Sequence, residues 1–169
     1  MILSAQSIRL RCQWTEGRSA GEEKEDALLS PFIDRERAHG VSAGLSPAGY
    51  DLRLVLEDDR EEHWLAPGEF LLAATVERFQ MPNDLLGLVH DKSTWARRGL
   101  SVFNTVIEPG WRGWLTLELV NHGQNTIHLR RGMGIAQVVF HLLDRPTVEP
   151  YPDDAKYQDQ AFGPVGARS

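Results

Sequence analysis

Tyr50-Asp51-Leu52-Arg53-Leu54-Val55-Leu56 is the stretch that decides the fold. Apolar and polar side chains alternate along it, as they do in a half-buried β-strand. Further apolar runs follow at Phe70–Val76, Trp114–Val120 and Ile135–Leu142, and residues typical of turns separate them. Many short strands at such spacing predict a β-sandwich, a barrel or a jelly roll. The chain is therefore expected to be mainly β.

The segments on either side of these strands have a different character. Residues Ser4 to Cys12 predict a short helix, with Ser4 as its N-cap. The stretch from Glu16 to Asp26 is polar and rich in Gly and Glu, which predicts a surface loop. The strand pattern fades before a polar tail, Tyr151 to Ser169. We expect a single domain over residues 1–169: an N-terminal helix and loop over 1–47, a β core over 48–147 and a C-terminal arm over 148–169.

Composition limits the classes of function. A chain of 169 residues with 41% hydrophobic content fits one domain with one core. The net charge of −6 argues against a general nucleic-acid-binding protein, which usually carries a basic face. It still allows a triphosphate to be held by a few local cations and a metal ion. No apolar run approaches the roughly 18 residues of a membrane span, and the N-terminus lacks the pattern of a signal peptide, so we expect neither.

The single cysteine, Cys12, excludes one chemistry. It cannot form an intramolecular disulfide, which fits a cytoplasmic location. Zinc nucleobase deaminases bind their metal through His or Cys together with a Cys-x-x-Cys pair, and one cysteine cannot supply that pair. If this protein deaminates a base, we expect it to do so without zinc.

Residues 87–123 contain two candidate functional features. The first is a group of two cations and two hydroxyls within six residues, which can bind phosphate oxygens but is also common at a solvated helix start: Lys92, Ser93, Thr94 and Arg97. The second is Glu118, which strand alternation places on one face with Thr116 and Val120. A carboxylate among apolar strand residues must be solvated, ion-paired or functional.

The order of the motifs points to a known family. They are Ala48–Leu52, Pro67–Glu69, Leu85–Gly87, Lys92–Leu100, Ile107–Gly113, Glu118, Gly132–Gln137 and Asp154–Gln160. This ordered set resembles the dCTP deaminase and dUTPase superfamily, most closely its dCTP deaminase branch. The resemblance implies a distorted jelly roll, the dUTPase-like β-clip. It also implies a homotrimer with active sites at subunit interfaces, Mg²⁺ carried by the substrate phosphates, and a C-terminal arm that folds over the substrate. We expect a deoxynucleoside triphosphate as the partner, and neither nucleic acid nor membrane.

Glu118 separates the two branches of this superfamily. It follows Gly113 by five positions, where deaminases carry a glutamate and dUTPases typically an apolar or small residue. The resemblance therefore implies zinc-independent hydrolysis of dCTP to dUTP and ammonia. Glu118 would take a proton from the water that attacks C4 and pass one to the departing amine. Ser93 and Arg97 would hold that water and stabilise charge.

The resemblance assigns other residues to nucleotide binding. Triphosphate contacts are expected from Lys92, Ser93, Thr94, Lys156 and Gln160, with Tyr151 and Gln137 nearby. The sugar and base are expected to contact Thr105, Val106, Ile107 and Glu108, and Trp111 packs either against the deoxyribose or in the core.

The exact base and product stay open. The loop before Glu108 is shorter than in typical dCTP deaminases, with Val102-Phe103-Asn104-Thr105-Val106 where those enzymes tend to carry His-x-Thr-Ala. A modified cytosine or uracil therefore remains an alternative base. The alternative functions are a bifunctional enzyme that gives dUMP and pyrophosphate, a dUTPase-like pyrophosphatase, and a non-catalytic nucleotide-binding regulator.

Overall fold

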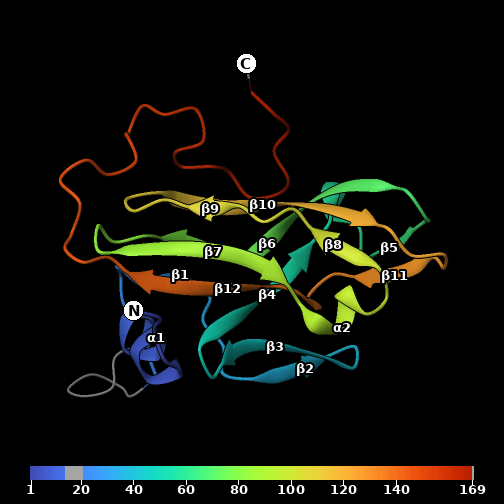
Figure 1. The fold of residues 1–169 in the computed structure, drawn as a ribbon, viewed down its shortest axis with the longest axis horizontal. Coiled ribbons are helices and arrows are strands. Elements are labelled where there is room, and N and C mark those ends of the chain that lie inside the picture. The colour runs from blue at the N-terminus through green and yellow to red at the C-terminus, as the bar shows by residue number, and fades with distance from the viewer. Residues whose placement is uncertain (14–20, 169) are drawn as a thin grey trace.

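Antiparallel strands dominate the computed structural model, which describes residues 1–13 and 21–168 (Figure 1). The mainly β architecture predicted from the strand pattern is confirmed. The helical elements are α1 (Ala5–Cys12), η1 (Glu57–Asp59) and α2 (Ser93–Ala96). The strands are β1 (Leu29–Ser30), β2 (Glu36–Ala38), β3 (Val41–Ser46), β4 (Gly49–Val55), β5 (Glu62–Leu65), β6 (Phe70–Gln80), β7 (Leu85–Asp91), β8 (Leu100–Val102), β9 (Val106–Ile107), β10 (Arg112–Asn121), β11 (Ile127–Arg130) and β12 (Gly134–Leu142).

Most of the strands join one curled sheet. Its main path runs β8-β10-β6-β4-β12-β7-β9, while β1 pairs with β6, β3 with β4, and β2 with β3. The strands β5 and β11 form a separate ribbon. Neighbours in the sheet are mostly distant in sequence, and the strand pairs are antiparallel throughout the part of the chain that is described. This non-local pairing is typical of jelly-roll folds.

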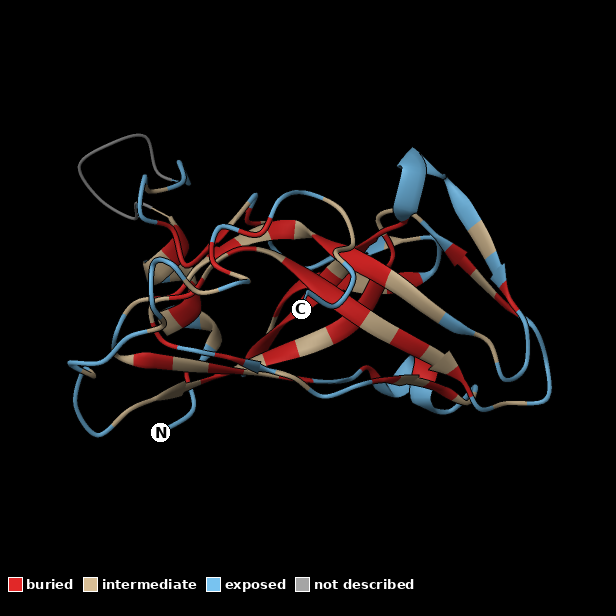
Figure 2. Ribbon diagram, turned by 90° about the horizontal axis from the view of Figure 1, so that it is seen from above, coloured by how far each residue is buried: buried red, intermediate tan, exposed pale blue. Residues whose placement is uncertain are grey.

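The core lies on one face of the long strands. Buried and half-buried positions alternate along the central strands (Figure 2). On β10, Leu117 and Leu119 have no solvent exposure, whereas Glu118 and Val120 are half-buried. Successive side chains of a strand point to opposite faces. The fold therefore turns Glu118 away from the core leucines.

Strand β4 corrects one expectation. The alternation predicted a strand with one solvated face, but both faces are covered. The Asp51 carboxylate pairs with the Lys92 ammonium and accepts from Ser42 Oγ at 3.1 Å. Arg53 Nε donates to Glu77 Oε1 at 2.6 Å. Asp51 is buried and Arg53 is half-buried, and each has a partner on a neighbouring segment, which the sequence pattern does not reveal.

The N-terminal helix is confirmed with its cap. Ser7 N donates to Ser4 Oγ at 3.4 Å, and Ile8 and Cys12 are buried in the core. The predicted loop from Glu16 to Asp26 lies outside the described residues up to position 20 and is turn-rich beyond it. No helix in residues 1–13 or 21–168 is long and apolar enough to cross a membrane.

Beyond β12 the chain turns back toward the sheet. In Figure 1 this C-terminal arm, drawn in red, crosses above β10. A parallel bridge between Gly113 and Gln160 joins the arm to that strand. The arm therefore lies against the sheet of its own chain.

Candidate active site

A cavity of 560 Å³ opens between the sheet and the C-terminal arm. Its volume falls in the range of about 300–1,000 Å³ typical of small-molecule sites. Its wall is formed by residues of β6, of the segment around β9, of β10 and of the arm. The lining residues are Phe70, Leu72, Thr105, Val106, Ile107, Glu108, Trp111, Leu115, Thr116, Glu118, Tyr151, Tyr157, Gln160, Val165 and Ala167.

Glu118 places an unpaired carboxylate oxygen in this wall. Its Oε2 and Thr105 Oγ1 are the two buried side-chain polar atoms without a hydrogen-bond partner among the described residues. Both residues line the cavity. Burial raises the pKa of Glu118, and its own backbone N–H opposes that shift. Buried polar atoms are usually paired, so two orphaned atoms on one cavity indicate a ligand.

Backbone bonds fix the segment that carries Thr105. Phe103 N donates to Glu118 O at 3.0 Å, and Val89 N donates to Thr105 O at 3.1 Å. Strand β9 then pairs with Gly87 and Leu88 of β7. The segment is held on two sides, which keeps the Thr105 hydroxyl and the Glu118 carboxylate on the same cavity.

A local irregularity of β10 brings two adjacent residues to the cavity wall. The register with β6 shifts between Trp114 and Thr116, and Leu115 N donates to the buried Thr75 Oγ1 at 3.1 Å. As a result Leu115 and Thr116, although adjacent, both line the cavity. Trp111 is buried at 6% exposure and also lines the cavity, so it belongs to the core and to the site.

The C-terminal arm closes one side of the cavity. Thr116 Oγ1 accepts hydrogen bonds from Gln160 Nε2 at 2.7 Å and Val165 N at 3.0 Å. Tyr151 and Gln160, both predicted to bind substrate, therefore lie in the wall. Lys156 is exposed, donates to Arg168 O at 2.8 Å and is not part of the wall.

The predicted phosphate-binding segment lies apart from this cavity. In the view of Figure 1, α2 lies below the sheet while the arm crosses above it. Ser93, Thr94 and Arg97 are exposed on or beside α2, and none of them lines the cavity. The buried Trp95 anchors the segment by donating from Nε1 to Gly134 O at 2.7 Å.

Lys92 and Gln137 belong to a different cluster. The Lys92 ammonium contacts the Asp51 carboxylate and donates to Ser42 Oγ at 2.9 Å. Gln137 Nε2 donates to Asp51 Oδ1 at 3.2 Å. Both side chains are thus engaged within the protein, and their role toward phosphate stays a prediction.

Sequence reasoning assigned no role to half of the cavity wall. Thr116 was foreseeable, because it lies two positions before Glu118 on the same strand. The others depend on strand register or on the path of the arm: Phe70, Leu72, Leu115, Tyr157, Val165 and Ala167.

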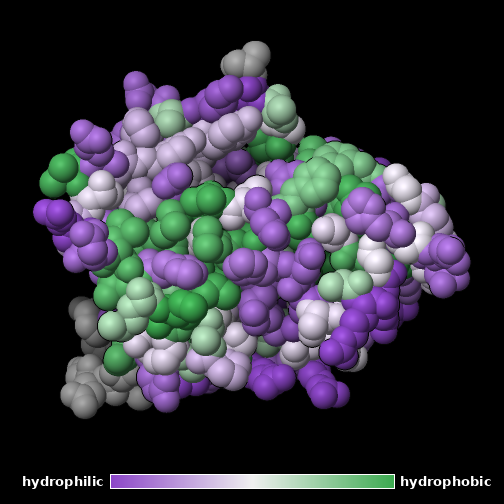
Figure 3. All heavy atoms as spheres, viewed as in Figure 1, coloured by the Kyte–Doolittle hydropathy of each residue, from purple (hydrophilic) through white to green (hydrophobic). Residues whose placement is uncertain are grey.

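An apolar surface lies beside the site. Hydrophobic side chains gather over β7 and β9 on the face shown in Figure 3. Leu86 and Leu88 are half-buried there, and Val106, which pairs with Leu88, is 51% exposed.

Solved structures define the class of fold. The EIAV dUTPase matches with a TM-score of 0.53 and 20% identity, over 75% of this chain and 98% of that one. A dUTPase variant from phage phi11 of S. aureus, which coordinates a structural Mg(II) ion, matches with a TM-score of 0.53 and 20% identity, over 76% and 95%. The chain therefore has the dUTPase-like jelly-roll fold expected from its motifs.

Sequence comparison then identifies the family. The family model described as dCTP deaminase-like matches residues 55–143. A dCTP deaminase of Idiomarina loihiensis is 39% identical over 136 residues, which cover 78% of this chain and 69% of the relative. One from Hamiltonella defensa is 38% identical over 148 residues, covering 82% and 73%. The chain belongs to the dCTP deaminase-like family.

Proposed function

We propose that this chain hydrolyses dCTP, or a closely related deoxycytidine nucleotide, to dUTP and ammonia. The observation that carries the proposal is the unpaired, partly buried Glu118 carboxylate in the wall of a ligand-sized cavity. Membership of the dCTP deaminase-like family supports the same reaction.

Glu118 performs the proton transfers in this proposal. Its ionised carboxylate accepts a proton from a water as the water oxygen bonds to C4 of cytosine. The protonated carboxyl then gives this proton to the exocyclic amine, whose bond to C4 breaks to release ammonia. The proton of the new C4 hydroxyl ends on N3 as the C4 carbonyl of the uracil product forms. Its partly buried site raises the pKa toward the working pH, which suits a group that must both accept and donate a proton.

The remaining wall would orient the nucleotide. The Thr105 hydroxyl, which has no hydrogen-bond partner in the part of the chain that is described, is available to the base or sugar. Val106, Ile107 and Glu108 continue that wall, and Trp111 offers a ring face toward the deoxyribose. The arm would add Tyr151 and Gln160, with Lys156 directed to the phosphates.

A homotrimer would bring the missing groups to the cavity. Ser93, Thr94 and Arg97 lie away from the cavity of their own chain. We propose that the α2 segment of a neighbouring subunit supplies the water-holding and phosphate-binding groups, with Lys92 released from Asp51 or acting through it. The apolar surface over β7 and β9 supports such association. We place this trimer in the cytoplasm.

Mg²⁺ would enter with the substrate. The part of the chain that is described offers no group of three or more His, Cys, Asp or Glu side chains that could hold a metal ion. A magnesium ion is usually held largely by substrate phosphates, so the acidic cavity residues need not bind it. When bound, the ion neutralises triphosphate charge, while Glu118 acts at the base.

Product analysis tests this proposal against its alternatives. Purified protein is incubated separately with dCTP and with dUTP in the presence of Mg²⁺, and nucleotides, pyrophosphate and ammonia are quantified. Ammonia and dUTP from dCTP are expected. Release of dUMP with pyrophosphate from dCTP would establish the bifunctional reaction, and turnover of dUTP alone would overturn deamination. If neither nucleotide reacts, C5-methylated and C5-hydroxymethylated dCTP are assayed next, and inactivity on both would favour a nucleotide-binding regulator.

A further inference from the structure

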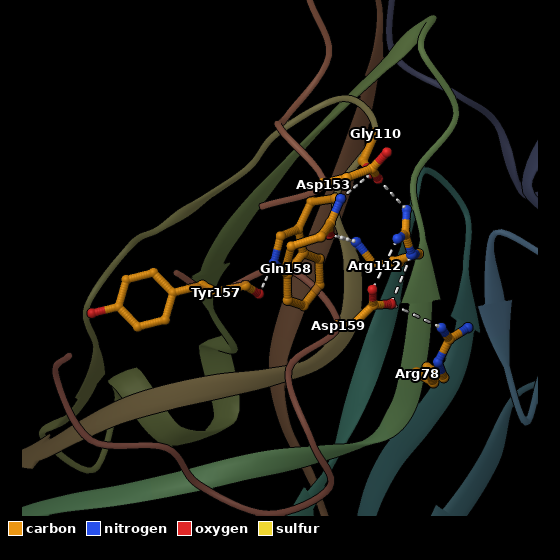
Figure 4. Close-up of polar contacts among 8 residues, drawn as sticks. Arg78, Gly110, Arg112, Asp153, Tyr157, Gln158 and Asp159 are labelled. Atoms are coloured by element: carbon orange, nitrogen blue, oxygen red, sulfur yellow. Dashed lines mark hydrogen bonds and ion pairs between the residues drawn. The ribbon is translucent and has the colours of Figure 1, made fainter. Parts of the chain in front are cut away.

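The C-terminal arm is fastened next to the cavity by a cluster centred on Arg112 (Figure 4). Its guanidinium binds Asp159 with two parallel bonds, Nε to Oδ1 at 2.7 Å and Nη2 to Oδ2 at 2.8 Å. The remaining Nη1 donates to Asp153 Oδ1 at 2.9 Å. Arg78 Nη2 adds a longer contact to Asp159 Oδ1 at 3.8 Å. One arginine of β10 thus binds Asp159 of the arm in a bidentate geometry and Asp153 through a single bond.

The backbone around Arg112 holds the same stretch of the arm. Arg112 N donates to Gln158 Oε1 at 2.9 Å, and Gln158 Nε2 donates to Gly110 O at 3.0 Å. Trp111 Nε1 donates to Tyr157 O at 2.8 Å. These bonds fix the position of the arm against the turn that precedes β10.

The attachment leads directly into the cavity wall. Gln160, the residue after Asp159, donates from Nε2 to Trp114 O and to Thr116 Oγ1, each at 2.7 Å. Asp159 itself has a φ of 52°, a left-handed conformation that is uncommon outside glycine and persists where the surroundings hold it. This turn directs the Asp159 carboxylate to Arg112 while Gln160 reaches Thr116, two positions from Glu118.

We propose that Arg112 is a positioning residue. Its ion pairs with Asp153 and Asp159, here called the clasp, hold the arm across the cavity and so set the affinity for the nucleotide. The proposal rests on the proposed function, since the arm contributes Tyr151 and Gln160 to the site. Glu118 lies on β10 itself and keeps its place when the arm detaches. Loss of the clasp therefore weakens substrate binding and leaves the chemical step nearly intact.

The clasp is also a surface feature. The side chains of Arg112 and Asp159 are 34% and 54% exposed. Exposed ion pairs are screened by salt, so the arm is expected to loosen as ionic strength rises.

Two independent disruptions test the clasp. The first is Arg112→Gln, and the second is Asp153→Asn combined with Asp159→Asn, which alters only exposed arm residues. The matched control is Arg130→Gln, a surface arginine on β11 that lies 3.8 Å from Glu62 and outside the arm contacts. Tryptic cleavage at Lys156, followed by mass spectrometry, reports arm detachment without substrate. KM and kcat for dCTP are measured at low and high NaCl.

We expect both disruptions to speed cleavage at Lys156. KM should rise by about five- to tenfold, the size of a screened, charge-assisted contact, and kcat should stay within about twofold of the value for the unmodified protein. The KM of the unmodified protein rises with NaCl toward that of the variants, whereas the KM of the variants changes less. Unchanged cleavage and KM in both variants would overturn the proposal, as would a fall in kcat with KM constant. If the unmodified protein turns over neither dCTP nor its C5-modified forms, the proposed function fails. Equal cleavage rates in all proteins would separately reject the clasp.

Discussion

Two glutamates on neighbouring strands have opposite surroundings. Glu77 of β6 has no solvent exposure, and both its oxygens are bonded: Oε1 to Arg53 Nε at 2.6 Å and Oε2 to Arg53 N at 3.0 Å. Glu118 of β10 is half-buried, and its Oε2 has no hydrogen-bond partner in residues 1–13 and 21–168. The first carboxylate ties β4 to β6, while the second faces a cavity.

The contrast separates a structural carboxylate from the one that we propose to be reactive. Burial raises the pKa of both groups, but at Glu77 the charge and hydrogen bonds of Arg53 oppose the shift. Burial lowers the pKa of Arg53, but attraction to Glu77 raises it, and the net shift is upward. Both members of the pair are therefore kept charged by each other. Glu118 has no such counter-ion among the described residues. Its own backbone N–H opposes the raised pKa, and a ligand in the cavity would complete the stabilisation of the ionised form, as expected of a group that exchanges protons with a substrate.

The largest effect is expected from Glu118→Gln. Removing the proton-transfer group should lower kcat for ammonia release by about 10²- to 10⁴-fold. Nucleotide affinity should persist, because the amide keeps the shape of the side chain. Ammonia release and equilibrium binding of dCTP measure the two quantities. Glu62→Gln on β5, an exposed glutamate distant from the cavity, serves as the control. Retained turnover in Glu118→Gln would remove the distinction between the two glutamates.

The next largest effect is expected from Glu77→Ala. Breaking a buried ion pair on one side costs about 3–5 kcal/mol, because the remaining charge loses its partner. The free energy of unfolding from urea titration should fall by this amount. The double variant Arg53→Met with Glu77→Leu should recover most of it, since neither charge then remains. A loss below about 1 kcal/mol, the size of an exposed pair, would contradict a structural role for Glu77.

These glutamates also show how far sequence reasoning reaches. The position of Glu118 at the cavity could be predicted because a single strand's alternation indicates its face, while its chemical role is what the family resemblance implies and stays a prediction. Glu77 could not, because its partner Arg53 lies on β4, and no local pattern reports that β4 and β6 are neighbours. For the same reason the solvated face predicted for β4 was wrong. Local periodicity determines strands, whereas their partners depend on non-local packing.

The residues of the candidate site also divide into those that local sequence predicts and those that depend on non-local packing. Residues within one segment, such as Thr105 to Glu108, were predicted and lie together at the cavity. Phe70 and Leu72 enter the wall only because β6 pairs with β10, where Leu72 lies opposite Glu118. Arg112 was missed because its aspartate partners lie some forty positions away on the arm, as the 41- and 47-residue separations show.

A smaller effect concerns pH. The proposed deamination requires ionised Glu118, and burial raises its pKa, so kcat/KM should fall on acidification at a pH above the ordinary value for glutamate. The raised pKa of Glu118 also makes the stability of the fold depend on pH, and the sign of this effect is definite. A raised pKa in the folded state gives a stabilising contribution that is present at acid pH and is lost as pH rises through that pKa. Glu118→Gln should therefore have the higher Tm at neutral pH, with the difference shrinking in acid. An acid limb at the ordinary glutamate pKa would contradict this assignment.

The smallest effect is expected from Thr105→Val, which removes the second orphaned atom with little change in shape. The hydroxyl has no hydrogen-bond partner among the described residues, so its loss should leave the free energy of unfolding unchanged or slightly higher. If the hydroxyl bonds the nucleotide, KM for dCTP should rise about fivefold, the size of one neutral hydrogen bond. Thr126→Val, at an exposed position directly before β11, is the control. A loss of stability with constant KM would show that the Thr105 hydroxyl serves the fold, and Glu118 alone would then mark the cavity as reactive.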